Sequence, residues 1–113
     1  MTQATPQPRR SRPPGRIHEA IVSGQPVLCL SGDIEATTVY AFTRTCPKPC
    51  EYSTVDVHGA TFLDWEAVAL LLRVTNSARR TGALPRLLGA TGQVARILQR
   101  TEALSQFDIA DTA

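Results

Sequence analysis

Two acidic residues flank the only tryptophan of the chain within "ATFLDWEAVALLL", residues 60–72, and these side chains could do chemistry or bind a partner. Asp64 and Glu66 stand two positions apart at the start of a helix-like pattern, where side chains so spaced point in different directions and do not converge on one substrate. His58 lies on the preceding segment and could approach Asp64. No serine-nucleophile motif and no metal-binding HExxH motif accompanies them. We therefore expect no catalytic residue, no metal site and no cofactor, in a protein that is not an enzyme.

The three cysteines allow a second kind of chemistry. Cys29 lies in the apolar run "VLCL" and is predicted to be a small buried hydrophobe. The spacing of Cys46 and Cys50 in "CPKPC" can bring their sulfurs together, but a zinc site needs a second pair of ligands that the sequence lacks. We expect two reduced thiols in a loop, with a redox-active pair as the alternative.

A short glycine-containing turn, "GATG" at Gly89–Gly92, precedes a predicted helix. Backbone N–H groups at the start of a helix can bind an anion. So short a match is more typical of a plain helix start, with Thr91 as the capping residue. We therefore expect a capped helix here, with an anion site as the alternative.

Length and composition favour one cytoplasmic globular domain. The 113 residues allow a single modest core, and the hydrophobic fraction of 42% is ordinary for a soluble chain. No apolar run approaches the roughly 20 residues of a membrane span. The N-terminus also lacks the apolar segment of a secretory signal, so we expect a cytoplasmic protein with no membrane partner.

Basic charge is concentrated at the N-terminus. Four of the twelve basic residues lie in the first sixteen positions, with no acid among them: Arg9, Arg10, Arg12 and Arg16. From Ile17 onward, eight basic residues face ten acidic ones, which argues against direct nucleic-acid binding. Residues 1–16 are rich in proline and arginine and cannot bury enough apolar surface to fold. They are predicted to be a disordered tail before a domain at 17–113.

Strands and helices are predicted to alternate along this domain. Two short strands surround the turn at Gly24–Pro26, and the elements that follow are a helix at about Glu35–Thr45, a strand at Ser53–Val57, a helix at Trp65–Arg80, a strand at Arg86–Leu88 and a helix after Thr91. The segment "FDIA" is either a last edge strand or the start of a frayed end. In the first helix, Val39 and Tyr40 share the apolar spacing. This order predicts a sheet covered by helices, with parallel inner strands because their connections are long.

The helix predicted to begin at Trp65 explains why an acidic pair stands there. Asp64 occupies the N-cap position, and Glu66 lies in the first turn, where the helix dipole favours an anion by about 0.3–1 kcal/mol. Trp65 either packs over the helix entry or, if exposed, anchors a partner. On a helical wheel, the polar stripe includes Glu66 and Arg73 and is bordered by Trp65, Ala69 and Leu70.

Four segments, in this order, resemble the STAS domain of bacterial anti-sigma-factor antagonists: "VLCLSGDIEATT", "TVDVHGATFLD", "RRTGALPRLLGATGQVARIL" and "LSQFDIA". They correspond to the family's opening strand and first helix start, its central strand, the passage from its second to its third helix, and its end. The resemblance runs from about Ile17 to Ala110. It implies an α/β fold with a four- to five-stranded mixed sheet and helices packed mainly on one face.

The resemblance also implies a function in transcription regulation. Antagonists of this family bind an anti-sigma factor that has a kinase-type ATP-binding fold, and so release a sigma factor. That kinase phosphorylates a serine or threonine in an Asp-Ser-Ser/Thr-Gly motif at the mouth of the second helix. This chain reads Asp64-Trp65-Glu66-Ala67 there. Glu66 thus stands at the phosphoacceptor position and has no hydroxyl group to modify.

Two interpretations of Glu66 follow from the resemblance. Glu66 carries about −1 charge against the −1.5 to −2 of phosphoserine, so it either imitates the modified form and weakens binding, or belongs to a surface that a partner accepts without a switch. We favour the second. The predicted partner-binding residues are Asp64, Trp65, Glu66, Ala67, Leu70 and Arg73. Cys46, Cys50 or Thr61 would then be candidates for another switch.

A different class of function stays open. A domain of this fold could instead sense a small ligand or nucleotide through the "GATG" turn or the Glu66 surface. It could also sense thiol redox state through Cys46 and Cys50. The sequence does not decide between a monomer and a weak homodimer.

Overall fold

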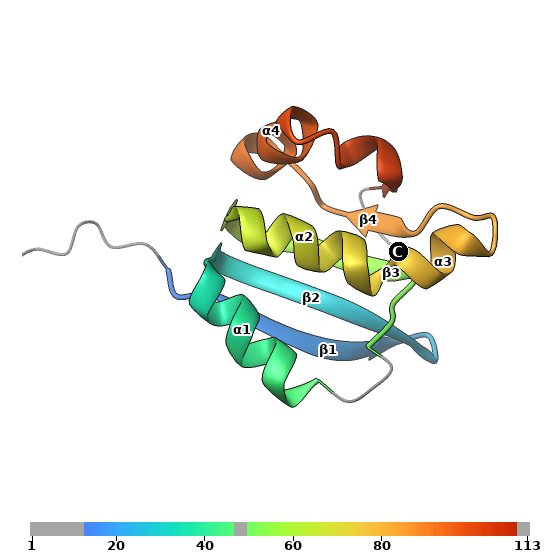
Figure 1. The fold of residues 1–113 in the computed structure, drawn as a ribbon, viewed down its shortest axis with the longest axis horizontal. Helices are drawn as coiled ribbons and strands as arrows, with labels where there is room; N and C mark the ends of the chain where they lie inside the picture. The colour runs from blue at the N-terminus through green and yellow to red at the C-terminus, as the bar shows by residue number, and fades with distance from the viewer. Residues whose placement is uncertain (1–12, 47–49, 111–113) are drawn as a thin grey trace, which may run out of the picture.

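A five-stranded mixed sheet forms the centre of the molecule (Figure 1). The computed structural model describes residues 13–46 and 50–110. The strands are β1 (Arg16–Val22), β2 (Gln25–Ile34), β3 (Thr54–Leu63), β4 (Arg86–Leu88) and β5 (Asp108–Ala110). They lie in sequence order across the sheet, with β1 antiparallel to β2 and every later neighbour parallel. The mixed sheet implied by the resemblance is confirmed.

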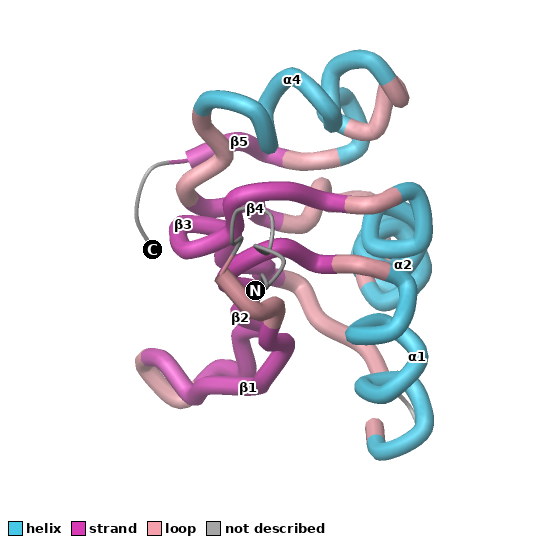
Figure 2. The backbone as a smooth tube through the Cα atoms, turned by 90° about the vertical axis from the view of Figure 1, so that its left-hand side faces the viewer, coloured by secondary structure: helices cyan, strands magenta, loops and turns pink. Residues whose placement is uncertain are grey.

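Helices connect the parallel strands. They are α1 (Ala36–Thr45), α2 (Trp65–Val74), α3 (Asn76–Arg80) and α4 (Gly92–Arg100), followed by the short 3-10 helix η1 (Leu104–Gln106). Figure 2 shows α1 and α2 together on one side of the sheet, and the two helices contact each other. In the described part of the chain, none of these helices has the length and apolar character needed to cross a bilayer.

The core is aliphatic and lies between the sheet and the helices. Its fully buried side chains come from neighbouring strands, from α2 and from α4, and they include Leu28, Leu30, Val55, Leu71 and Leu98. Each such burial stabilises the fold by about 1.5–3 kcal/mol relative to an exposed side chain. The α2 helix is therefore held firmly against the sheet.

Strand β3 is longer than predicted. The sequence suggested a strand ending at Val57 and a break at Gly59, whereas β3 continues to Leu63. The register shifts between the pairs Cys29–Asp56 and Ser31–Gly59, so β3 gains one residue relative to β2 there. A Cβ atom on Gly59 would lie only 3.0 Å from the Cβ of Ser31. Gly59 therefore permits an irregular close approach of two strands and does not end one.

The helix predicted over Trp65–Arg80 is two helices. Thr75 separates them with φ −107° and ψ 4°, outside helical values. Its side chain is fully buried, and its hydroxyl donates to the carbonyl of Leu71 at 2.6 Å. A hydroxyl that bonds back to the preceding turn competes with the helical backbone pattern. The break redirects the chain after α2.

The end of the predicted N-terminal tail is part of the fold. The N–H of Asp33 donates to the carbonyl of Pro13 at 3.1 Å, and Pro14 forms an isolated bridge with the same residue. Strand β1 begins at Arg16, one residue before the predicted domain start. The prediction of disorder is thus wrong for residues 13–16, because the backbone there pairs with β2. Residues 1–12 lie outside the described part of the chain.

Candidate functional site at the start of helix α2

The candidate site lies at the edge of the sheet where β2 and β3 end. The N–H of Asp64 donates to the carbonyl of Ile34 at 2.9 Å, which ties the end of β3 to the end of β2. Because the two strands are parallel, α1 and α2 both begin at this edge, as Figure 1 shows at its left. Crevices outside the carboxyl ends of parallel strands are common binding sites in α/β folds.

Asp64 caps α2 as predicted. Its Oδ1 accepts a hydrogen bond from the N–H of Trp65 at 2.7 Å, and its backbone is extended, as expected of an N-cap residue. Its carbonyl accepts the first helical hydrogen bonds, from Ala67 and Val68. The carboxylate is thus engaged in starting the helix, and it fixes where the next two side chains point.

Glu66 meets a tyrosine from the neighbouring helix. The hydroxyl of Tyr40 donates to Oε2 of Glu66 at 3.3 Å, from α1 to α2. The pKa of Tyr40 lies above its usual value of 10.0. The main cause is the negative charge of the Glu66 carboxylate, and burial and Asp64 contribute less. The negative charge of Glu66 therefore disfavours the phenolate and extends to higher pH the range in which the phenol can donate.

Two large aromatic side chains beside Glu66 are exposed. Trp65 exposes 67% of its surface and Tyr40 exposes 54%. This excludes the interpretation of Trp65 as a packed cover over the helix entry. Tyr40 shares the helical spacing of α1 with Val39, but only Val39 is buried. The residue type could have indicated this exposed position, because the phenol group of a tyrosine suits a place between an apolar layer and water.

Two predicted partner-binding residues lie in the core. Ala67 has no exposed surface and Leu70 exposes 1% of its own, so neither can contact a partner and both assignments are wrong. The reason is that α1 packs against this flank of α2, where Phe42 of α1 and Leu70 line the same cavity. A helical wheel of α2 alone does not reveal the second helix.

Arg73 is exposed two turns after Glu66, as its predicted role requires. It lines two concavities, one toward α1 and one toward η1. No side-chain hydrogen bond or ion pair joins the guanidinium of Arg73 to another residue within the described ranges. The site therefore consists of Asp64, Trp65, Glu66 and Arg73 with the unpredicted Tyr40.

A comparison with family models identifies the domain. A model of the STAS domain matches residues 16–113. The chain belongs to the STAS domain family. A search of curated proteins finds no match to it. A STAS domain fits a general regulatory role.

Cys46 and Cys50 of this STAS domain form a disulfide, which corrects the expected pair of reduced thiols. Cys46 ends α1 in an extended conformation, and its Cα lies 6.1 Å from that of Cys50, within the usual range for a disulfide. The bridge lines a cavity of about 170 Å³ together with Leu70 and Arg73. It therefore lies beside α2. The residues between the two cysteines lie outside the described ranges.

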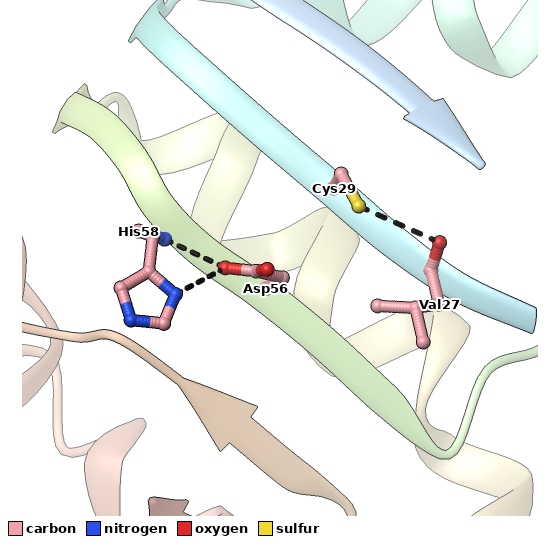
Figure 3. Close-up of polar contacts among 4 residues, drawn as sticks. All are labelled: Val27, Cys29, Asp56 and His58. Carbon is pink, nitrogen blue, oxygen red and sulfur yellow. Dashed lines mark hydrogen bonds and ion pairs between the residues drawn. The ribbon is translucent and has the colours of Figure 1, made fainter. Parts of the chain in front are cut away.

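His58 pairs with Asp56, and the predicted approach to Asp64 is wrong. The ring Nδ1 of His58 lies 2.8 Å from Oδ1 of Asp56, and the backbone N–H of His58 donates to the same oxygen at 2.9 Å (Figure 3). Cys29 lies on the neighbouring strand and is partly exposed, not buried as predicted. Partial burial, and secondarily Asp56, raise the pKa of its thiol above 9.0, so Cys29 is a poor nucleophile.

The "GATG" turn serves packing in the STAS domain. Gly89 has φ +78°, and a Cβ atom there would collide with the ring of His58. Thr91 occupies the N-cap of α4, but its side chain makes no capping hydrogen bond, which corrects the predicted role. Across the ranges that the structure describes, His, Cys, Asp and Glu form no group of three that could hold a metal ion.

Thr61, the other candidate for a switch, is exposed at the end of β3. Its hydroxyl donates to Oδ1 of the buried Asp33 at 2.5 Å. Added phosphate at Thr61 would face this carboxylate and be repelled by it. The geometry therefore favours a structural role for Thr61 at the edge where α1 begins.

Proposed function

We propose that this STAS domain is a cytoplasmic anti-sigma-factor antagonist of a bacterium, which binds an anti-sigma factor with a kinase-type fold. The observation that carries the proposal is Glu66 in the first turn of α2, beside the exposed Trp65. In the antagonists that the sequence resembles, a phosphorylated serine or threonine stands at this position. Here the kinase has no hydroxyl group to modify, so binding is not switched off at this residue.

The exposure of Trp65 supports a role in protein binding. A tryptophan buries a large area when a partner covers it, and such residues dominate the energy of many interfaces. With 67% of its surface in water, Trp65 adds little to the fold. The protein acts by binding in this proposal, without catalysis and without contact to nucleic acid or membrane.

The hydrogen bond from Tyr40 to Glu66 favours a protein that can always bind its partner over one in which Glu66 imitates phosphoserine and weakens binding. Phosphoserine offers three acceptor oxygens and up to about −2 charge. Glu66 offers two oxygens and one charge, and one of these oxygens already accepts from Tyr40. A partner therefore meets a carboxylate held by a phenol, not a free dianion. This surface suits a partner that has adapted to Trp65 and Glu66.

An affinity pull-down from the native cytoplasm tests the proposal, with the wild type and Glu66→Ser side by side. Retention of a kinase-fold anti-sigma factor by the wild type supports it. Retention by Glu66→Ser alone means that Glu66 imitates phosphoserine and that the protein is an inactive relative of the antagonists. If neither retains such a factor, the antagonist function is wrong for this chain.

One observation favours a second candidate function, a sensor of thiol redox state. The Cys46–Cys50 disulfide borders the same cavity as Arg73 and Leu70 of α2. Pull-downs with and without a dithiol reductant, repeated with Cys46→Ser, would show whether reduction changes partner binding. We do not propose the nucleotide-sensing alternative, because the His58 ring occupies the space over Gly89 in the "GATG" turn.

A further inference from the structure

We propose that a groove between α2, α3 and η1 docks an acidic, aliphatic segment of the partner protein. In this arrangement a partner carboxylate binds Arg73 and partner aliphatic side chains lie on Ala69 and Leu72. The inference rests on the proposed function and extends it, because it specifies the chemistry of a second partner segment beyond the Trp65–Glu66 site.

The groove has an apolar floor and cationic walls. It is a shallow, open concavity of about 520 Å³, and its lining residues are Ala69, Leu72, Arg73, Asn76, Arg79 and Gln106. None of these residues is acidic. Ala69 and Leu72 expose carbon surface to water at the floor, whereas Arg73 and Arg79 bring two guanidinium groups. An aliphatic segment bearing carboxylates complements both features.

The two arginines differ in availability. Arg79 donates to the carbonyls of Leu72 and Gln106 and to the hydroxyl of Thr75, so its guanidinium is engaged within the fold. Arg73 makes no such bond with any residue of the described ranges. A guanidinium group has five N–H donors and binds a carboxylate in a two-pronged geometry. Arg73 is therefore the group that a partner carboxylate would bind.

The distribution of charge over the fold points the same way. From Ile17 onward the sequence has more acids than bases, yet the four helices carry a single acid, Glu66. Their arginines are Arg44, Arg73, Arg79, Arg80, Arg96 and Arg100. The helical layer is thus basic while the acids gather in strands and loops. This field attracts an acidic surface to the helical side.

The groove continues directly from the Trp65 site. Trp65, Ala69 and Arg73 are spaced four residues apart on α2, so they share one face of the helix. They span about 12 Å along its axis. A partner helix of two to three turns could contact Trp65 at one end and Arg73 at the other. This continuity is the reason to assign the groove to a protein segment and not to a free anion.

Peptide titration followed by nuclear magnetic resonance tests the inference. The probes are an amphipathic peptide of leucine and glutamate, about twelve residues long, and a counterpart in which lysine replaces glutamate. We expect the acidic peptide to shift the amide signals of Ala69, Leu72, Arg73, Asn76 and Gln106. The basic peptide should leave these signals in place. Shifts spread evenly over every exposed arginine would overturn the inference.

Charge-reversal variants make the test specific. Arg73→Glu is expected to weaken binding of the acidic peptide about tenfold at low salt, because attraction becomes repulsion. Arg96→Glu makes the same charge change on α4 outside the groove and should alter binding less than about twofold. Equal losses in the two variants would contradict docking in the groove. So would self-association of the wild type that Arg73→Glu abolishes, because the groove would then bind a second copy.

The peptide titration tests the groove inference and the pull-down tests the antagonist function, so either claim can be wrong while the other stands. If an anti-sigma factor is retained equally by the wild type and Arg73→Glu, and the acidic peptide does not bind, the antagonist function stands and the groove inference is wrong. If the peptide binds in the groove but no anti-sigma factor is retained, the groove inference survives as an acidic-segment site and the antagonist function is wrong.

Discussion

The hydroxyl of Tyr40 on α1 donates a hydrogen bond to the carboxylate of Glu66 on α2, across 3.3 Å. This contact joins the two helices at the position where the antagonists that the sequence resembles carry their phosphoacceptor. Tyr40 and its neighbour in the site, Trp65, are both largely exposed near this negative charge. A partner with an apolar surface and one cation would match this group.

Trp65→Ala is expected to weaken binding of the anti-sigma factor by 2 kcal/mol or more, roughly thirtyfold, as for interface anchors. The free energy of unfolding should change by less than about 0.5 kcal/mol, because the side chain is exposed. Titration calorimetry and urea unfolding measure the two effects. Ile21→Ala, which removes another exposed apolar side chain on β1, is the control and should leave binding unchanged. Equal affinity of Trp65→Ala and wild type would remove Trp65 from the interface.

Arg79→Ala should destabilise the fold by about 1–3 kcal/mol. Its guanidinium donates to the Leu72 carbonyl at 2.5 Å and to Thr75 Oγ1 at 2.9 Å, and it lies 5.6 Å from the centroid of the Phe107 ring. Arg79→Lys should recover only part of the loss, because an ammonium group lacks the two-pronged geometry. Urea unfolding compares these variants with Arg80→Ala, the exposed neighbour, for which we expect almost no change.

Leu70→Ala should cost about 2–4 kcal/mol of unfolding free energy, because Leu70 exposes only 1% of its surface between α1 and α2. The matched control is Leu84→Ala, which makes the same change at a side chain that is 52% exposed and should cost far less. A small loss at Leu70, with a large loss of partner affinity at unchanged stability, would restore its sequence-based assignment to the interface.

Tyr52 should make stability fall at high pH. Burial, together with the hydrogen bond to Glu19 at 2.7 Å and the charge of that carboxylate, raises the pKa of Tyr52 from 10.0 to about 12. A folded pKa above the unfolded one stabilises the protein below about pH 10 and loses this effect as pH rises toward 12. The urea midpoint should therefore fall over this range more in the wild type than in Tyr52→Phe.

The absorbance of the phenolate checks the same pKa directly. The chain has two tyrosines, so Tyr40→Phe leaves Tyr52 alone to titrate. We expect its midpoint near 12, and a midpoint near the ordinary 10.0 would show that the bond to Glu19 does not hold the proton.

Local patterns predicted most of the elements of this fold. Strand β4 was predicted with its observed bounds, Arg86–Leu88, and α2 begins at Trp65 as its capping aspartate indicated. These predictions succeed because apolar spacing and caps act over a few neighbouring residues. The break at Thr75 was not visible, because the apolar spacing continues across it and the cause is a buried hydroxyl bond.

The site was predicted less well, because it depends on contacts between elements. Leu70 was assigned to the surface, since its burial comes from α1 and not from α2 itself. Tyr40 was not predicted at the site, and its bond to Glu66 joins residues 26 positions apart. The spacing of Cys46 and Cys50 allowed a disulfide, but only the end of α1 brings the two residues into range. Contacts of this kind can be predicted only when the arrangement of the helices and strands is known.

The most direct test of the central claim is the affinity of the purified anti-sigma factor for the wild type before and after incubation with ATP and Mg²⁺. Because Glu66 has no hydroxyl group, we predict that the dissociation constant changes less than about twofold and that no phosphate is incorporated. Glu66→Ser should instead gain one phosphate and lose affinity. Loss of wild-type affinity after ATP treatment, with phosphate on another residue, would contradict an antagonist that escapes control by its kinase.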